Sequence, residues 1–164
     1  MNGERHFLDV FFSPASVAVV GVSRSPLKLN YNLFANLVRL KFPGRLYPVN
    51  PSVPEVLGIK AYPNLQSIED EIGLVVCAVP ATATLDVIKD CVEKGVKGVV
   101  IVAGGFSEIG GEGGKLQAEI ARLLRESGIR AIGPNSLSPI NTANNLVIGF
   151  GPHEKLKRGS TSFI

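Results

Sequence analysis

Five predominantly apolar runs are spaced along the chain, and each has the length of a β-strand. Polar and apolar residues do not alternate within them, as they would in a strand with one face in water. Uninterrupted apolar strands are typical of a parallel sheet that is covered on both faces. The runs are Val17–Val20, Leu46–Val49, Leu74–Val79, Val99–Ala103 and Ile129–Ile132. They predict the strands of one central sheet.

Helical patterns lie between these runs. In three segments, apolar residues recur three or four positions apart, which gives each helix one apolar face. These series begin at Leu33, Leu85 and Leu116. We expect Asn30 to cap the first helix, and Gly95 and Gly128 to end the second and the third. The segment Ser67–Asp70 predicts the start of a short fourth helix.

Strand and helix alternate along the chain, so we predict an α/β fold: a Rossmann-like, doubly wound, mainly parallel sheet with helices on both faces. Ligands of such folds bind beyond the carboxyl ends of the strands, near the point where the strand order reverses. Five loops rich in Gly, Pro, Ser or Asn follow the predicted strands, at residues 21–30, 50–53, 80–82, 103–106 and 133–136. Any one of them is explained by the needs of a turn. Five at one edge of a sheet favour a ligand site.

The first loop carries the chemistry of a phosphate site. It begins at Gly21 and contains Arg24 and Lys28, so backbone N–H groups, a helix N-terminus and two cations would meet an anion. No Asp or Glu occurs from Val10 to Pro54. An NAD-binding fold normally has an acid about 20 residues past this loop to hold the ribose. The pattern therefore favours a different phosphorylated ligand.

Composition narrows the possibilities further. A length of 164 residues suits one domain, and a net charge of +3 mildly favours an anionic ligand. No block of basic residues indicates nucleic acid binding, and no apolar run is long enough to span a membrane. Cys77 and Cys91 lack metal-ligand spacing, so we expect reduced, buried thiols and a cytoplasmic location. His6 and His153 lie outside the segments with strand or helix patterns, so we expect neither to be catalytic. We expect no catalytic residue and no metal site in this chain.

Five motifs come in a family-like order: Pro14–Ser23, Tyr47–Pro51, Ala78–Ala81, Gly104–Phe106 and Gly133–Ser136. Together they resemble the N-terminal CoA-binding domain of NDP-forming acyl-CoA synthetases, relatives of the succinyl-CoA synthetase α subunit. The similarity covers roughly residues 7–150. It implies a CoA-binding Rossmann-like domain at 1–150. Residues 151–164 would be a linker and the start of a following domain that is absent, with Ser160–Ile164 as a strand just beginning.

The resemblance implies a function in making acyl-CoA from an acid, CoA and a nucleoside triphosphate, with NDP and phosphate as the other products. In the family, the reaction passes through an acyl phosphate and a phosphohistidine of the next domain, so this chain would not be catalytically complete alone. The expected partners are coenzyme A or acyl-CoA and the remaining ligase domains or a partner subunit. A stand-alone or regulatory CoA-binding module is the alternative. An NAD(P)-binding oxidoreductase domain is a weaker one, because Asn50-Pro51-Ser52 offers neither an acid nor a base. The acyl group and the nucleotide stay open.

The resemblance places the cofactor-binding residues in the five loops. In the family, those of the first loop hold the CoA phosphates and those of the second line the nucleotide end. The next two loops shape the adenine and pantetheine channel, and the last lies near where the thiol meets the partner domain. In that order the residues are Gly21, Val22, Ser23, Arg24 and Lys28; Val49, Asn50 and Pro51; Val79, Pro80, Ala103, Gly104, Gly105 and Phe106; Asn135 and Ser136. The Phe106 ring is expected either to pack on the ligand or to anchor its loop.

Two departures from the family pattern concern the phosphates. The first loop usually reads Gly-Lys-x-Gly, whereas Leu27 and Asn30 stand at the two glycine positions here. Ser52 stands where a lysine is common. The chain therefore has two extra side chains and one cation fewer around the expected phosphates, which leaves weak CoA binding open.

Overall fold

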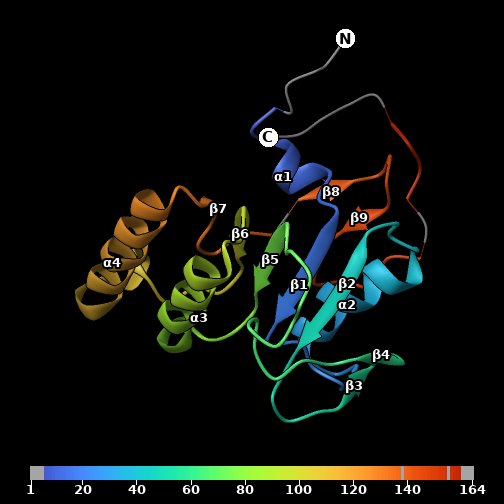
Figure 1. Ribbon diagram of the computed structural model, residues 1–164, viewed down its shortest axis with the longest axis horizontal. Helices are drawn as coiled ribbons and strands as arrows, with labels where there is room; N and C mark the ends of the chain where they lie inside the picture. Colours follow the sequence, from blue (N-terminus) through green and yellow to red (C-terminus); the bar gives the residue numbers. More distant parts are fainter. Residues whose placement is uncertain (1–5, 138, 155, 160–164) are drawn as a thin grey trace.

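The computed structural model describes residues 6–137, 139–154 and 156–159. Its centre is a five-stranded sheet in the order β2-β1-β5-β6-β7 (Figure 1). The strands are β1 (Ser16–Val20), β2 (Arg45–Val49), β5 (Leu74–Cys77), β6 (Gly98–Ile101) and β7 (Arg130–Ile132). Every neighbouring pair runs parallel. The predicted Rossmann-like α/β sheet is confirmed.

Both faces of the sheet are covered. Helices α3 (Ala81–Lys94) and α4 (Gly111–Ser127) pack on one face, where Val75 and Cys77 point. The other face, with Leu74 and Val76, packs on α2 (Leu29–Arg39) and on the short helix α1 (Asp9–Phe12). Because successive strand residues point to opposite faces, a strand between two helical layers must be apolar throughout. This explains the uninterrupted apolar runs of the sequence.

Two of the three predicted helix caps are confirmed, and the third is wrong. Gly95 and Gly128 end α3 and α4 in the left-handed conformation, each with φ +71°. The expectation that Asn30 caps α2 is wrong, since α2 begins at Leu29 and Lys28 holds the cap position without a side-chain cap bond. Asn30 already lies inside the helix, and its amide donates instead to the Gly21 carbonyl oxygen. Its side chain thus joins α2 to the loop after β1.

The expected helix at residues 67–70 does not form. Asn64 Oδ1 accepts from the Ser67 amide at 2.9 Å, and Ser67 Oγ donates to the Asn64 carbonyl oxygen at 2.8 Å. Such local bonds compete with helix formation. The Ile68 carbonyl oxygen accepts a hydrogen bond from the Lys94 ammonium group. The segment is therefore a turn that buries Leu65 and Ile68 against the sheet.

Several short elements were not predicted. The hairpin of β3 (Glu55–Val56) and β4 (Ile59–Lys60) follows β2, and the hairpin of β8 (Ile140–Asn141) and β9 (Leu146–Val147) follows β7. A 3₁₀ turn, η1 (Ser107–Ile109), precedes α4. Strands of two residues are too short for any periodic pattern, so only tertiary pairing identifies them.

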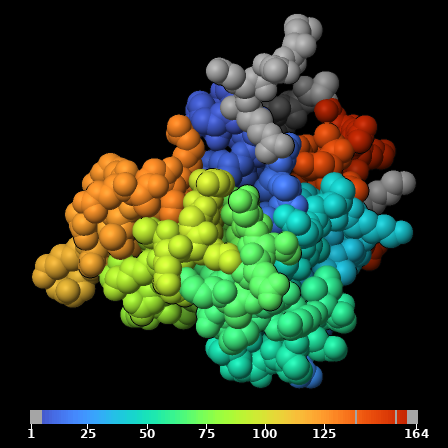
Figure 2. All heavy atoms as spheres, in the orientation of Figure 1, coloured from blue at the N-terminus to red at the C-terminus, as the bar shows by residue number. Residues whose placement is uncertain are grey.

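The segment after β9 lies against α2, as the red and cyan surfaces show in Figure 2. Asn36 of α2 is fully buried, and its amide donates to the carbonyl oxygens of Gly149 and Gly151 at 3.0 and 2.9 Å. Its Oδ1 accepts from the His153 amide at 2.9 Å. Residues 151–153 are therefore tied to the domain, while the strand expected at 160–164 lies outside the described residues. No described helix is long and apolar enough to cross a membrane.

Candidate functional site

The carboxyl ends of the five strands share one edge of the sheet, so the five loops singled out in the sequence follow one another along it. From β1 the chain crosses to β2 on one side, whereas β5 lies on the other side of β1. The strand order therefore reverses between β1 and β5. In doubly wound sheets, the crevice at this switch point is where ligands bind.

The loop after β1 is held by the two elements that follow it. The Gly21 amide donates to the Val49 carbonyl oxygen at 3.0 Å, and Asn50 Nδ2 donates to the Val22 carbonyl oxygen at 2.8 Å. On the other side, the Asn30 amide binds the Gly21 carbonyl oxygen. The Val22 and Val49 side chains are buried, so only their backbone groups could meet a ligand. Asn30 Oδ1 is buried without a hydrogen-bond partner among the described residues.

Arg24 and Lys28 are exposed, and neither forms an ion pair within the described ranges. Ser23 Oγ accepts from the Ser25 amide at 3.0 Å, which fixes the turn at Arg24. Leu27, one of the departures from the family pattern, is 96% exposed, so its side chain does not fill the loop. The loop thus offers two uncompensated positive charges to an anion.

The end of β2 forms a shallow part of the same edge. A hollow of about 380 Å³ is lined by residues 50–54 with Ala61 and Pro63. Pro51 is exposed at its rim, and the Ser52 amide donates to Asn50 Oδ1 at 2.8 Å. Asn50 bonds to the loop after β1 through its Nδ2 and to its own loop after β2 through its Oδ1. The Asn50 side chain therefore holds the two loops together.

The three loops after β5, β6 and β7 meet farther along the edge. The Asn135 amide donates to the Ala103 carbonyl oxygen at 2.9 Å. A methyl group placed on Gly104 would lie 3.5 Å from Asn135 Cγ, and one on Gly105 would lie 3.3 Å from Ala81 Cβ. These distances bring the start of α3, the β6 loop and the β7 loop into contact.

The remaining predicted residues lie along the same line. Val79 is half-buried and Pro80 is exposed at the end of β5. The Ser136 amide donates to the Ile101 carbonyl oxygen at 3.4 Å. Phe106 is 1% exposed and belongs to the core under α4, so its ring anchors the loop and only its backbone could face a ligand.

Sequence reasoning missed one charged residue of this edge, Glu108 in η1. Its Oε1 accepts from the Gly105 amide at 2.6 Å and its Oε2 accepts from the Phe106 amide at 3.1 Å. These backbone donors, the Gly105 amide first, hold the pKa of the carboxyl below its usual range. The available signal was an acid three residues after a loop glycine and just before a helix, which is the spacing of a capping box.

The other reactive groups do not gather here. Burial raises the pKa of Cys77 to about 11 and raises that of Cys91 as well, so both thiols stay protonated. His153 is bonded through its backbone to Asn36, and His6 lies at the opposite edge of the sheet. Within the part of the chain that the structure describes, no cluster of three His, Cys, Asp or Glu residues could hold a metal ion.

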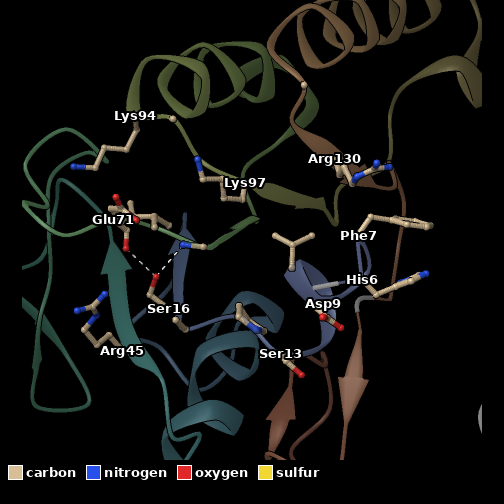
Figure 3. Close-up of a pocket in the computed structure, with 17 residues that line it drawn as sticks. His6, Phe7, Asp9, Ser13, Ser16, Arg45, Glu71, Lys94, Lys97 and Arg130 are labelled. Atoms are coloured by element: carbon tan, nitrogen blue, oxygen red, sulfur yellow. Dashed lines mark hydrogen bonds between the residues drawn. The ribbon is translucent and has the colours of Figure 1, made fainter. Parts of the chain in front are cut away.

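A hollow of about 660 Å³ lies at that opposite edge, among the amino ends of the strands (Figure 3). Ser16 Oγ closes its floor, since it donates to the Glu71 carbonyl oxygen and accepts from the Gly73 amide, both at 2.9 Å. Four cations line it: Arg45, Lys94, Lys97 and Arg130.

Three of these cations already have partners. The Lys94 ammonium group binds a backbone carbonyl of the connection before β5, and Arg45 pairs with Asp70 at 3.6 Å. The Arg130 guanidinium lies 4.5 Å from the centre of the Phe7 ring. Cations near helix C-termini such as those of α3 and α4 also have a structural use there. The carboxyl edge, at the switch point, is therefore the better candidate site.

Several known proteins are similar to this chain. A family model described as a CoA binding domain matches residues 15–141. The ADP-forming acetate–CoA ligase II subunit alpha of Pyrococcus furiosus is 41% identical over 157 residues, covering 96% of this chain and 34% of that protein. The ADP-forming acetate–CoA ligase II of Archaeoglobus fulgidus is 38% identical over 156 residues, covering 95% of this chain and 23% of that protein.

A solved structure is similar over the same region. It is the dinucleotide forming acetyl-coenzyme A synthetase 1 of Ca. Korarchaeum cryptofilum, in complex with phosphate and ADP. The TM-score is 0.86 at 35% identity, over 93% of this chain and 32% of that one. The chain thus spans between 23% and 34% of the length of these relatives. By its sequence and its fold, it belongs to the CoA binding domain family.

Proposed function

We propose that this chain is the coenzyme A-binding part of an ADP-forming acyl-CoA ligase, and that CoA or acyl-CoA lies across the carboxyl edge of the sheet. The full enzyme would convert an acid, CoA and ATP to acyl-CoA, ADP and phosphate. The domain would occupy residues 1–150, with 151–164 leading into further ligase domains. Family membership and the partial coverage of the ligase relatives support this proposal.

The single observation that carries it is the charge of the first loop. Coenzyme A has several phosphate charges at its nucleotide end, and Arg24 and Lys28 are exposed cations without an internal partner in the described chain. Backbone N–H groups and the N-terminus of α2 add partial positive charge at the same place. None of the five loops contains Asp or Glu. The nucleotide end of CoA fits this loop by charge.

The candidate edge contains no histidine, and this indicates which steps of the ligase reaction the chain would not carry out. Acyl transfer needs a thiol, which CoA brings, and an activated acyl group, which the remaining domains or a partner subunit would supply. Neither His6 nor His153 lies among the five loops. This chain would therefore bind and orient the thiol donor, and the phosphoryl and acyl transfer steps would take place on residues outside it.

Calorimetric titration of the purified chain tests the proposal, with CoA, NADH and NADP⁺ as separate ligands. Saturable binding of CoA alone is expected. Lys28→Ala should weaken it by about 1–2 kcal/mol, or roughly 5- to 30-fold, if the ammonium group makes a charge-assisted phosphate contact.

Lys97→Ala is the matched control, because Lys97 is also an exposed lysine but lies in the hollow at the amino edge. Its CoA affinity should equal that of the wild type. A folded wild-type chain that binds no CoA, or binds a nicotinamide cofactor instead, would overturn the proposal. If Lys97→Ala weakens CoA binding and Lys28→Ala does not, CoA binds in the hollow at the amino edge of the sheet.

A further inference from the structure

Glu108 is an acidic side chain beside two of the candidate loops, those after β6 and β7. Its two carboxylate oxygens accept from consecutive backbone amides, Gly105 at 2.6 Å and Phe106 at 3.1 Å. A methyl group on Gly104 would lie 3.0 Å from Glu108 Oε1 and 3.5 Å from Asn135 Cγ. The carboxylate thus sits beside the β6 loop and the β7 loop at once.

The loop at Gly104–Phe106 has little else in its own sequence to fix the backbone of its two glycines. Gly105 has φ +102°, a conformation that favours glycine. Because glycine has no Cβ, its backbone can also adopt many other conformations, so this part of the loop is not fixed by its own residues. The Phe106 ring fixes one end of the loop in the core, but it leaves the Gly104–Gly105 peptide on the surface. A bidentate carboxylate replaces that freedom with two charge-assisted hydrogen bonds. Glu108 therefore helps to hold the exposed half of the loop in one shape, together with the Asn135 amide that donates to the Ala103 carbonyl oxygen.

The sign of the charge shows which part of a ligand this loop can face. Coenzyme A has its phosphates at one end and a neutral pantetheine arm with two amides and a thiol at the other. A carboxylate repels phosphate, so a loop held by a carboxylate suits the neutral arm better than the phosphates. The cations Arg24 and Lys28 lie in the loop after β1, which is separated from the loop after β6 by the strand β5.

We propose that Glu108 is a positioning residue for the pantetheine arm: its carboxylate holds the Gly104–Phe106 loop in the shape that receives the arm, and acts through that loop. This inference rests on the proposed function, because it assumes that CoA is the ligand. It assigns Glu108 no proton transfer, since both carboxylate oxygens are engaged with backbone amides.

Two titrations separate this role from a general structural one. CoA contains both halves of the ligand, whereas adenosine 3′,5′-bisphosphate contains only the nucleotide end. Glu108→Ala should weaken CoA binding about fivefold or more, the loss expected for two charge-assisted bonds that order a loop. The affinity for adenosine 3′,5′-bisphosphate should not change. Glu108→Gln keeps one acceptor oxygen and should fall between the wild type and Glu108→Ala.

Glu112→Ala is the matched control, since Glu112 is a nearby acid on the first turn of α4 that is 88% exposed and pairs only with Lys115 in the described chain. It removes the same charge without touching the loop, and its CoA affinity should equal that of the wild type. Equal CoA affinity in Glu108→Ala and wild type would overturn the inference. So would an equal loss for CoA and the bisphosphate, which would indicate general damage. A wild-type chain that binds no CoA would instead refute the proposed function on which the inference rests.

Discussion

Gly21 is where the first loop leaves β1, and Gly21→Ala tests how tightly the switch point is packed. Its φ of +86° is a conformation that costs other residues about 1–2 kcal/mol. An added methyl group would lie 2.7 Å from Val79 Cγ1 and 2.8 Å from the Ala78 carbonyl oxygen. The Val79 side chain can turn away, but the carbonyl belongs to the backbone leaving β5, so the loop must move. Crowding of this kind costs about 1–3 kcal/mol. The two terms together predict a loss of about 2–5 kcal/mol in the free energy of unfolding.

Gly58→Ala isolates the crowding from the conformational cost. Gly58 has φ +74°, and no atom lies within 4 Å of a methyl group added there. Its variant should therefore lose only about 1–2 kcal/mol. Urea unfolding followed by far-UV circular dichroism measures both variants, and equal slopes would show that the same surface is exposed on unfolding. If Gly21→Ala and Gly58→Ala unfold at the same urea concentration, the reasoning about the switch point is refuted.

Two further predictions concern the core. Asn36→Leu should cost about 2–4 kcal/mol, because the buried Gly149 carbonyl and the partly buried backbone groups of Gly151 and His153 lose their partner. Limited proteolysis should then cut this segment faster than in the wild type, and an unchanged cleavage rate would contradict this. Cys77 has its pKa raised from 9.0 to about 11 by burial, so between pH 9 and 11 the unfolded chain loses a proton that the folded chain keeps. Through this thiol alone, stability should fall over that window by about 1.4 kcal/mol per pH unit, and the raised pKa of Cys91 adds a loss of the same sign. Urea melts at pH 8 and 10.5 that gave equal stability would contradict it.

The candidate site was predictable as a set of loops but not as a set of side-chain contacts. Turn-forming residues after each strand, together with the rule for doubly wound sheets, predict which loops share an edge. The pairing of Asn50 with Val22, 28 residues apart, does not follow from residue type. The Phe106 ring shows the same limit, because the sequence leaves both a ligand contact and a core position open, and only its burial decides between them.

The sequence by itself determined the α/β class, the five parallel strands and the helix ends at Gly95 and Gly128, because these depend on local patterns of burial and on backbone freedom. The tertiary structure alone decided the strand order and the turn at residues 64–68, which forms instead of a helix. It alone also decided the role of Asn36 as the anchor of the segment after β9. The strand order and the Asn36 contacts depend on hydrogen bonds between residues far apart in the sequence, which are made only once the fold brings them together. The turn has local hydrogen bonds, and the burial of Leu65 and Ile68 against the sheet is its tertiary contribution. No periodicity along the chain encodes such pairings.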